Sequence, residues 1–178
     1  MGQHCRFWRA ASAGVHHFVQ GTVGGAERHS GVPHFESKRR IEERILSLGL
    51  PATFLRPAYF MENLYWKRAA ILDGAYESMG LDPDKSLQMI AADDIGAFAA
   101  LVFGNPEEYI GRAIELAGDE LTEPQMAATM AEVLGRPADL VPESAPPAYE
   151  DMAIMVAWFN QEGCAADIHL PCAKPAPA

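Results

Sequence analysis

Apolar residues alternate along the chain between strand-like runs and helical spacing. A short apolar run at 15–19 leads into a glycine-rich loop, which predicts a buried strand followed by a turn. Helical spacing of apolar positions over 35–48, with Gly49 as a stop signal, predicts a helix. Residues 52–55 form a second strand-like run. A strand, a loop, a helix and a strand in this order are typical of a parallel α/β sheet.

The same alternation continues less clearly through the rest of the chain. It predicts helices at 60–72, 95–103, 122–134 and 147–161, and strands at 87–91 and 113–116. Thr122 is placed to cap one of these helices, and Asp93 or Asp94 to cap another. The first residues predict a short or frayed helix, and the Pro/Ala tail at 169–178 has no means of packing a core.

Composition fits one globular domain. The chain has 178 residues, of which 49% are hydrophobic and 21% charged. A domain of this size buries roughly 70% of its unfolded surface. No run approaches the ~20 apolar residues of a membrane span, and no signal-peptide core is present. The three cysteines form no CxxC pair and suit a reducing compartment, so we expect a cytoplasmic protein.

The formal charge of −10 is distributed unevenly. Residues 1–80 carry ten bases and seven acids, a net +3, whereas residues 81–178 carry four bases and seventeen acids, a net −13. The acidic second half disfavours direct binding of nucleic acid. An anionic ligand is therefore expected to bind mainly through the first half.

Two motif-like segments fail the requirements of their chemistry. The loop Gly21-Thr22-Val23-Gly24-Gly25 follows a predicted strand, but Glu27 stands where a dinucleotide fingerprint needs its third glycine, and no helix opens there. This loop is therefore not a phosphate cradle. Cys164, His169 and Cys172 have metal-like spacing but no fourth ligand, so no metal site is predicted.

Three segments are distinctive together: Gly-Val-Pro-His-Phe-Glu-Ser-Lys at 31–38, Leu-Pro-Ala-Thr-Phe-Leu-Arg-Pro at 50–57 and Phe-Met-Glu-Asn at 60–63. They resemble the NmrA-like family of NAD(P)-binding proteins, an atypical branch of the short-chain dehydrogenase/reductase fold. The resemblance covers about 11–167, with these segments as its specific core and weaker flanks. The first ten residues and the tail after Ile168 do not resemble the family.

The resemblance implies a partial Rossmann-type parallel sheet that lacks the N-terminal dinucleotide-fingerprint half and carries a C-terminal α-rich substrate lobe. The expected organisation is a divergent N-terminus at 1–10, the partial NAD(P)-binding domain at 11–168 and the tail at 169–178. The strand at 15–19 then becomes a hydrophobic sheet edge open to another copy of the chain, a route to a homo-oligomer. Because the two ends of the chain do not resemble the family, we hypothesise a truncated or frame-shifted gene. Sequencing of the locus tests this hypothesis.

The resemblance also assigns site residues. The superfamily places a Tyr and a Lys four residues apart on one helix face. Lys38 matches that lysine, and His34 occupies the tyrosine position, as either a proton donor or a helix-entry residue that satisfies backbone carbonyls. Thr22 lies where relatives polarise a substrate carbonyl, with a loop hydroxyl bonded to its own backbone as the alternative. The segment that flanks the nicotinamide corresponds to Phe60, Met61, Glu62 and Asn63.

Three functions follow as hypotheses. The first is an NAD(P)-binding redox sensor or regulatory protein whose cofactor binding is weakened by the missing glycine-rich half. The second is an NAD(P)H-dependent reductase of a quinone-like or carbonyl substrate, and the third a non-functional fragment. The resemblance favours NADP over NAD. The expected partners are the dinucleotide and a small-molecule substrate, without nucleic acid or membrane.

Overall fold

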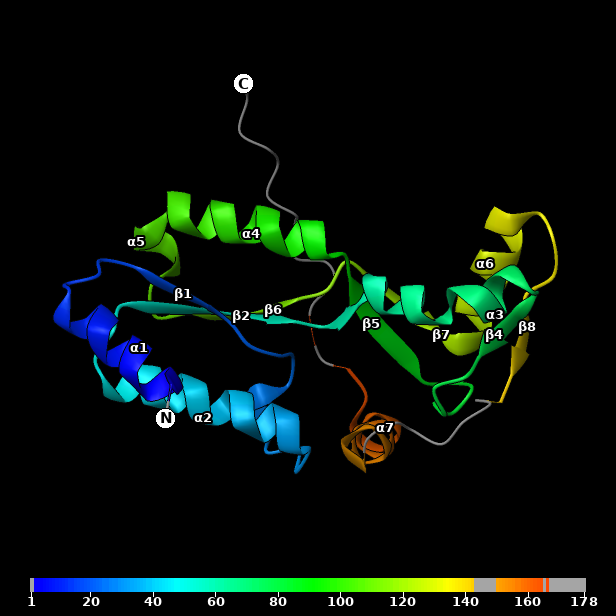
Figure 1. The fold of residues 1–178 in the computed structure, drawn as a ribbon, viewed down its shortest axis with the longest axis horizontal. Helices are drawn as coiled ribbons and strands as arrows, with labels where there is room; N and C mark the ends of the chain where they lie inside the picture. The colour runs from blue at the N-terminus through cyan, green and yellow to red at the C-terminus, as the bar shows by residue number, and fades with distance from the viewer. Residues whose placement is uncertain (1, 143–149, 165, 167–178) are drawn as a thin grey trace, which may run out of the picture.

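A three-stranded parallel sheet, in the order β1-β2-β6, lies between two layers of helices (Figure 1). The structure is a computed structural model and describes residues 2–142, 150–164 and 166. The strands are β1 (Phe18–Gly21), β2 (Ala52–Pro57) and β6 (Ala113–Leu116). One layer contains α1 (Gly2–Ser12) and α2 (Pro33–Ser47), and the other contains α4 (Ala92–Gly104) and α5 (Pro106–Tyr109).

Alternating side chains of β2 hold both layers against the sheet. Phe54 and Ala52 pack in one cluster with Ile45 of α2. Leu55 points to the opposite face and packs with Val102 of α4. Successive strand residues point to opposite faces, so a strand covered on both sides is apolar throughout. This explains why Ala52, Phe54 and Leu55 are all apolar, while the buried Thr53 hydroxyl donates to the carbonyl of Tyr109 at 2.6 Å.

Five further strands of the described chain build the other end of the molecule. A second sheet has the order β3-β5-β7, in which β5 pairs parallel to β3 and antiparallel to β7, and β4 pairs parallel to β8. These strands are β3 (Tyr59–Phe60), β4 (Ala75–Glu77), β5 (Ser86–Ile90), β7 (Asp119–Thr122) and β8 (Asp139–Val141). The helices here are the 3₁₀ helix η2 (Met61–Lys67), α3 (Arg68–Leu72) and α6 (Glu123–Leu134).

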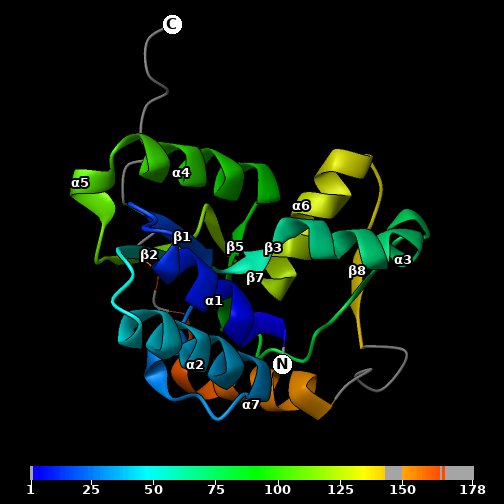
Figure 2. The ribbon, with the colours of Figure 1, turned by 60° about the vertical axis from the view of Figure 1, so that its left-hand side comes forward.

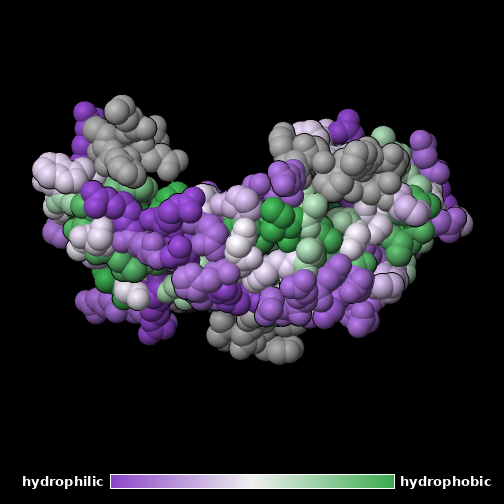
Figure 3. All heavy atoms as spheres, turned by 90° about the horizontal axis from the view of Figure 1, so that it is seen from below, coloured by the Kyte–Doolittle hydropathy of each residue, from purple (hydrophilic) through white to green (hydrophobic). Residues whose placement is uncertain are grey.

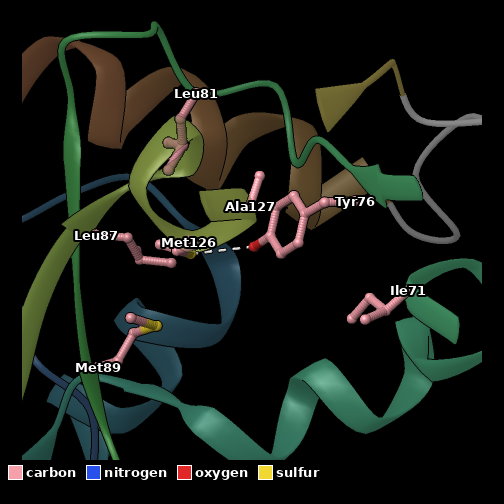
Figure 4. Close-up of a cluster of buried hydrophobic side chains, with 7 residues drawn as sticks. All are labelled: Ile71, Tyr76, Leu81, Leu87, Met89, Met126 and Ala127. Carbon is pink, nitrogen blue, oxygen red and sulfur yellow. Dashed lines mark hydrogen bonds between the residues drawn. The ribbon is translucent and has the colours of Figure 1, made fainter. Parts of the chain in front are cut away.

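A core around Tyr76 joins these short elements (Figure 4). Tyr76 is fully buried, and its hydroxyl donates to Sδ of Met126 at 3.0 Å. Leu87 of β5 and Ile71 of α3 belong to the same cluster. Burial raises the pKa of Tyr76 because the ionised phenolate would lose its hydration. Strands of three residues are thus stabilised by the shared core.

Helix α7 (Glu150–Glu162) lies beside α2, although more than a hundred residues separate them in sequence (Figures 1 and 2). Trp158 of α7 packs edge-on against Phe35 of α2, with ring centroids 5.6 Å apart. Both side chains are buried in a cluster with Val32 and Met155. The last helix of the described chain is therefore part of the same body as the first parallel sheet.

Several predicted elements are confirmed. The helix at 35–48 corresponds to α2, the strand at 87–91 to β5 and the strand at 113–116 to β6. Thr122 caps α6 as predicted, and Gln125 completes a reciprocal capping box with it.

Other predictions need correction. The strand expected at 15–19 begins at Phe18, because its ladder with β2 starts where Phe18 lies beside Ala52. The cap of α4 is Ala91, and Asp93 and Asp94 lie within its first turn, where their charge favours the helix dipole. The helix expected at 60–72 divides into β3, η2 and α3. The predicted start of the last helix, 147–149, lies outside the described residues.

Within the described chain, β1 pairs with β2 alone, so its other side is an open edge, as the family resemblance implied. Seen from below, hydrophilic side chains gather over the region of α2, and hydrophobic ones lie nearer the middle of the molecule (Figure 3). None of the described helices combines the length and the apolar character needed to cross a membrane.

We predict that Leu55→Ala lowers the free energy of unfolding by about 2–5 kcal/mol, because Leu55 is 2% exposed and its loss leaves a cavity between β2 and α4. Urea denaturation measures the change. Leu46→Ala removes the same atoms from a side chain that is 58% exposed on α2 and should change stability by less than about 0.5 kcal/mol. Equal effects of the two variants would contradict the packing described here.

Candidate functional site

A cavity of about 340 Å³ lies at the carboxyl ends of β1 and β2, the side of a parallel sheet where ligands bind. Its walls are mostly apolar and come from segments far apart in sequence. The loop after β1 gives Val23, Gly24 and Arg28, and the start of α2 gives His34 and Phe35. The far end of β2 and the residues beyond it give 56–60 and Asn63, and strands β5 and β6 give Gln88 and Glu115 respectively. Helix α7 and the residues after it give Met152, Met155, Phe159, Cys164 and Ala166.

The glycine loop after β1 packs closely against the wall of this cavity. The Gly24 N–H donates to the carbonyl of Pro57 at 2.9 Å, and the Gly25 N–H donates to Oε1 of Glu115 at 2.8 Å. Gly25 has φ +77°, and a Cβ there would lie 2.8 Å from both Arg28 and Trp158. Position 25 thus needs glycine for its backbone and for close packing. No helix longer than the three-residue 3₁₀ turn η1 (Ala26–Arg28) follows the loop before α2, which agrees with the interpretation that it is not a phosphate cradle.

Arg56, which lines the cavity, belongs to a buried ion pair. Arg56 at the end of β2 donates to Glu42 of α2 through Nε at 3.0 Å and Nη2 at 2.6 Å, and its Nη1 donates to Glu27 at 2.6 Å. Glu42 is only 5% exposed and also accepts the hydroxyl of Thr22 at 2.6 Å. Burial alone would lower the pKa of Arg56, but the hydrogen bonds and charge of Glu42 outweigh it and raise that pKa. Arg56 is therefore a structural partner at the end of β2.

The structure brings together three of the predicted site residues. His34, Phe60 and Asn63 all line the cavity, from α2, β3 and η2 respectively. Phe60 is 41% exposed, so its ring is accessible to a ligand. These three residues lie up to 29 positions apart in sequence, and the fold brings them to the wall of the same cavity.

The remaining predicted residues lie outside the cavity lining. Thr22 is buried and its hydroxyl proton is engaged by Glu42, so the structure gives it a packing role rather than access to a substrate carbonyl. Met61 packs against the Tyr76 core, and Glu62 accepts the N–H of Ala92 at the start of α4 at 2.9 Å. Lys38 lies one helical turn after His34 on α2, partly buried.

The imidazole of His34 lies across from α7. Its Nδ1 is 3.6 Å from Oδ2 of Asp151, and both side chains are 41% exposed. The ring also lies edge-on to Phe35, with centroids 4.7 Å apart. The structure thus gives His34 an acidic neighbour, and neither of the two roles considered from sequence included it.

Several cavity residues were not predicted from sequence. Tyr59 follows β2, and burial raises its pKa to about 12, although a hydrogen bond with Asn63 opposes the shift. Gln88 is buried and donates to Glu120 at 2.8 Å and to the carbonyl of Ala166 at 2.7 Å. Tyr59 directly precedes the Phe-Met-Glu-Asn segment, a proximity that could have drawn attention to it. Nothing in the sequence marks Gln88.

Burial also raises the pKa of the Cys164 thiol, which lines the cavity. Its Sγ accepts the N–H of Gln88 at 3.4 Å, so the residue serves in packing and is a poor nucleophile. Within the part of the chain that the structure describes, no three His, Cys, Asp or Glu side chains are grouped to hold a metal ion. His169 and Cys172 lie outside that part.

The fold and the cavity define a Rossmann-type α/β protein with its site at the carboxyl edge of the parallel strands. The family model for the NmrA-like family matches residues 9–172, and the chain belongs to this family. The chain is 31% identical over 133 residues to an NAD(P)H azoreductase of Xenophilus azovorans, covering 74% of this chain and 46% of that protein. It thus spans about half the length of this curated relative.

Two solved structures are similar in fold. One is an NADPH-dependent quinone oxidoreductase from Escherichia coli complexed with NADPH, with a TM-score of 0.78 and 23% identity over 93% of this chain and 62% of that one. The other is NmrA, a negative transcriptional regulator, in complex with NADP, with a TM-score of 0.66 and 19% identity over 89% and 55%. At these identities the likeness establishes the fold.

We predict that Glu42→Gln lowers the free energy of unfolding by about 3–5 kcal/mol, because it leaves the Arg56 charge without its buried partner. Thermal and urea denaturation measure the loss. The matched variant is Glu43→Gln, which removes a charge that is 57% exposed and pairs with Arg39 at the surface. That variant should change stability by less than about 1 kcal/mol. A Glu42 variant as stable as the Glu43 variant would refute the role of the buried pair.

We predict that Tyr59 destabilises the fold at alkaline pH. Below pH 10 its phenol is protonated in both states, whereas between about pH 10 and 12 the unfolded chain loses the proton and the folded chain keeps it. Stability therefore falls with rising pH in this window, by up to about 2 kcal/mol from this group. Tyr59→Phe should flatten that slope in urea titrations at several pH values. Tyr65→Phe, which removes a hydroxyl from an exposed ring, should leave the wild-type slope.

Proposed function

We propose that the cavity binds the nicotinamide end of NADP(H) beside a small carbonyl or quinone-like substrate, and that the chain is part of an NAD(P)H-dependent reductase. The observation that carries this proposal is the meeting of His34, Phe60 and Asn63 around one largely apolar cavity. The names of the azoreductase relative and of the quinone oxidoreductase support a reductase for this chain as well.

The cavity residues fit the nicotinamide end of the cofactor. The exposed ring of Phe60 offers a flat apolar face to a planar ring, and the amide of Asn63 can donate to or accept from a carboxamide. A volume of about 340 Å³ falls within the range of small-molecule sites. Among the described residues, no glycine-rich turn opens a helix to hold the pyrophosphate. The fit is therefore to one end of the dinucleotide.

The chemistry divides between the cofactor and this chain. When bound, the dinucleotide supplies a hydride. Lys38 would hold the ribose hydroxyls, since it matches the lysine of the family motif and lies one turn from His34. His34 would give a proton to the substrate oxygen, and the apolar side chains Phe35 and Phe159 would exclude water. Thr22 is left out of this set because its hydroxyl proton is donated to Glu42.

A redox sensor is the second candidate function. Histidine replaces the proton-donating tyrosine of the superfamily at position 34, and the Thr22 hydroxyl is engaged by Glu42. A protein with these two changes could bind the dinucleotide and report its redox state without turnover. The name of NmrA, a negative transcriptional regulator bound to NADP, supports this alternative.

Calorimetric titration with NADPH tests cofactor binding in either function. We expect Lys38→Ala to weaken NADPH affinity about tenfold through loss of a charged hydrogen bond. Arg40→Ala removes an exposed cation from the same helix and should leave the affinity unchanged. Absence of heat at millimolar NADPH would refute both candidate functions and favour a non-functional fragment. Equal affinity of the Lys38 variant and wild type would show that the site is wrongly assigned.

Turnover separates the two candidates. A reductase should oxidise NADPH steadily with a quinone, and His34→Ala should lower kcat by about 100-fold or more with NADPH affinity retained. If the protein is a sensor, the wild type and the His34→Ala variant should bind NADPH equally well, and neither should oxidise it. Consumption of NADPH that is unaffected by His34→Ala would exclude this histidine as the proton donor.

A further inference from the structure

We propose that Asp151 of α7 is a positioning residue that orients the His34 imidazole toward the cavity. The proposal rests on the proposed function, in which His34 donates a proton. It adds a residue from the far end of the chain to the site. The observation behind it is the 3.6 Å separation of Asp151 Oδ2 and His34 Nδ1.

The placement of α7 against α2 is fixed by contacts at its other end. Trp158 packs edge-on against Phe35, and the Arg28 guanidinium lies 4.4 Å from the centre of the Trp158 ring. Arg28 also donates through Nη1 to the carbonyl of Gly163 at 3.2 Å. Aromatic stacking and a cation–π contact in a partly buried site each stabilise this end of α7. The position of Asp151 therefore follows from a packed helix rather than from a loose surface segment.

Asp151 begins the face of α7 that packs toward α2. Residues 151, 155 and 158 lie at i, i+4 and i+7, which places them on one side of a helix. Met155 and Trp158 are buried on that side, at 7% and 8% exposure. A carboxylate at the head of an apolar stripe faces the first turn of α2, where His34 lies. Among the described residues, Asp151 is the acid within 4 Å of a His34 ring nitrogen.

The two nitrogens of the His34 ring then face different groups. With Nδ1 facing the carboxylate of Asp151, the opposite nitrogen, Nε2, is left for a molecule in the cavity. A carboxylate beside Nδ1 favours the ring form with a proton on that nitrogen and limits rotation of the ring. The contact is longer than a hydrogen bond here, and such contacts tighten when a ligand closes the site.

Reduction of the substrate carbonyl requires one hydride and one proton, and His34 would supply the proton. The bound dinucleotide would supply a hydride to the carbonyl carbon of the substrate and would itself be oxidised. The Nε2–H bond of the imidazolium breaks, and the proton forms an O–H bond with the substrate oxygen. His34 is left as the neutral ring with its remaining proton on Nδ1, next to Asp151, and regains a proton from water. The other charged groups near His34 are Arg28, Arg56 and Glu115, which line the cavity, and Lys38, which lies one turn further along α2.

Nitrogen NMR of the full chain, labelled with ¹⁵N-histidine, tests the proposal without cofactor. The His34 signals are assigned by their loss in His34→Asn. We expect the neutral ring to carry its proton on Nδ1 in the wild type and this form to be lost in Asp151→Ala. Glu150→Ala removes the same charge from the adjacent, exposed position of α7 and should leave the His34 signals unchanged. Unchanged signals in Asp151→Ala, or an equal change in both variants, would overturn the proposal.

Kinetics give a second readout that a purely structural role would not produce. With NADPH and a quinone, Asp151→Ala should lower kcat about tenfold or more with little change in KM, and Asp151→Glu should restore part of the loss. A change in KM alone would contradict a positioning role. Wild type that neither binds nor oxidises NADPH would refute the proposed function, while the NMR result would still decide whether Asp151 orients His34.

Discussion

The ion pair between Arg56 and Glu42 fixes the geometry on which the rest of the site depends. Two charges that are both largely removed from water need each other, since either one alone would carry a large desolvation penalty. The pair links the end of β2 to the middle of α2, and Glu42 also holds Thr22 at the end of β1. Glu27 of η1 binds the third nitrogen of Arg56. Four elements are thus tied together at the carboxyl edge of the sheet.

The cavity is a consequence of this arrangement. Glu42 holds the middle of α2 to β2, and the first turn of α2 places His34 and Phe35 in the cavity wall. Phe35 then provides the surface on which Trp158 and α7 pack. The order of dependence therefore runs from β2 to α2 and from α2 to α7. A substitution at the ion pair should reach the far wall of the cavity through these contacts, although no residue of α7 contacts Glu42 in the described hydrogen bonds and ion pairs.

The sequence predicted the elements whose patterns are long and regular, and it missed those whose stability comes from elsewhere. Helix α2, strands β2, β5 and β6, and the capped start of α6 follow from local spacing. Strands β4 and β8 have three residues each, too few for a period, and β7 has only one apolar residue among four. They form because their partner strands and, for β4 and β7, the Tyr76 core hold them. Glu42 belongs to a run of charges on α2 that resembles a solvated face, and only the position of Arg56 reveals that it is buried.

Long-range packing explains why the site was predicted in part. The family motif led to His34, Phe60 and Asn63 because these lie within one continuous stretch of matching sequence. The opposite wall comes from α7 and from Cys164, whose contacts with α2 and β5 span more than 70 residues and leave no local signal. Met155 and Trp158 are both buried core residues, and Met155 also lines the cavity.

The charge of the cavity refines the expectation that an anionic ligand would draw on the basic first half of the chain. Two arginines of that half reach the lining, but Arg56 is neutralised by Glu42 and Glu27. Arg28 lies 3.9 Å from Glu27, and Glu115 of the acidic half adds a carboxylate to the lining. Mostly apolar walls with balanced charges suit a neutral or weakly polar ring better than a phosphate. In the proposed function, the ring-shaped parts of the cofactor and the substrate would therefore lie inside the cavity, and the phosphate groups would lie outside it.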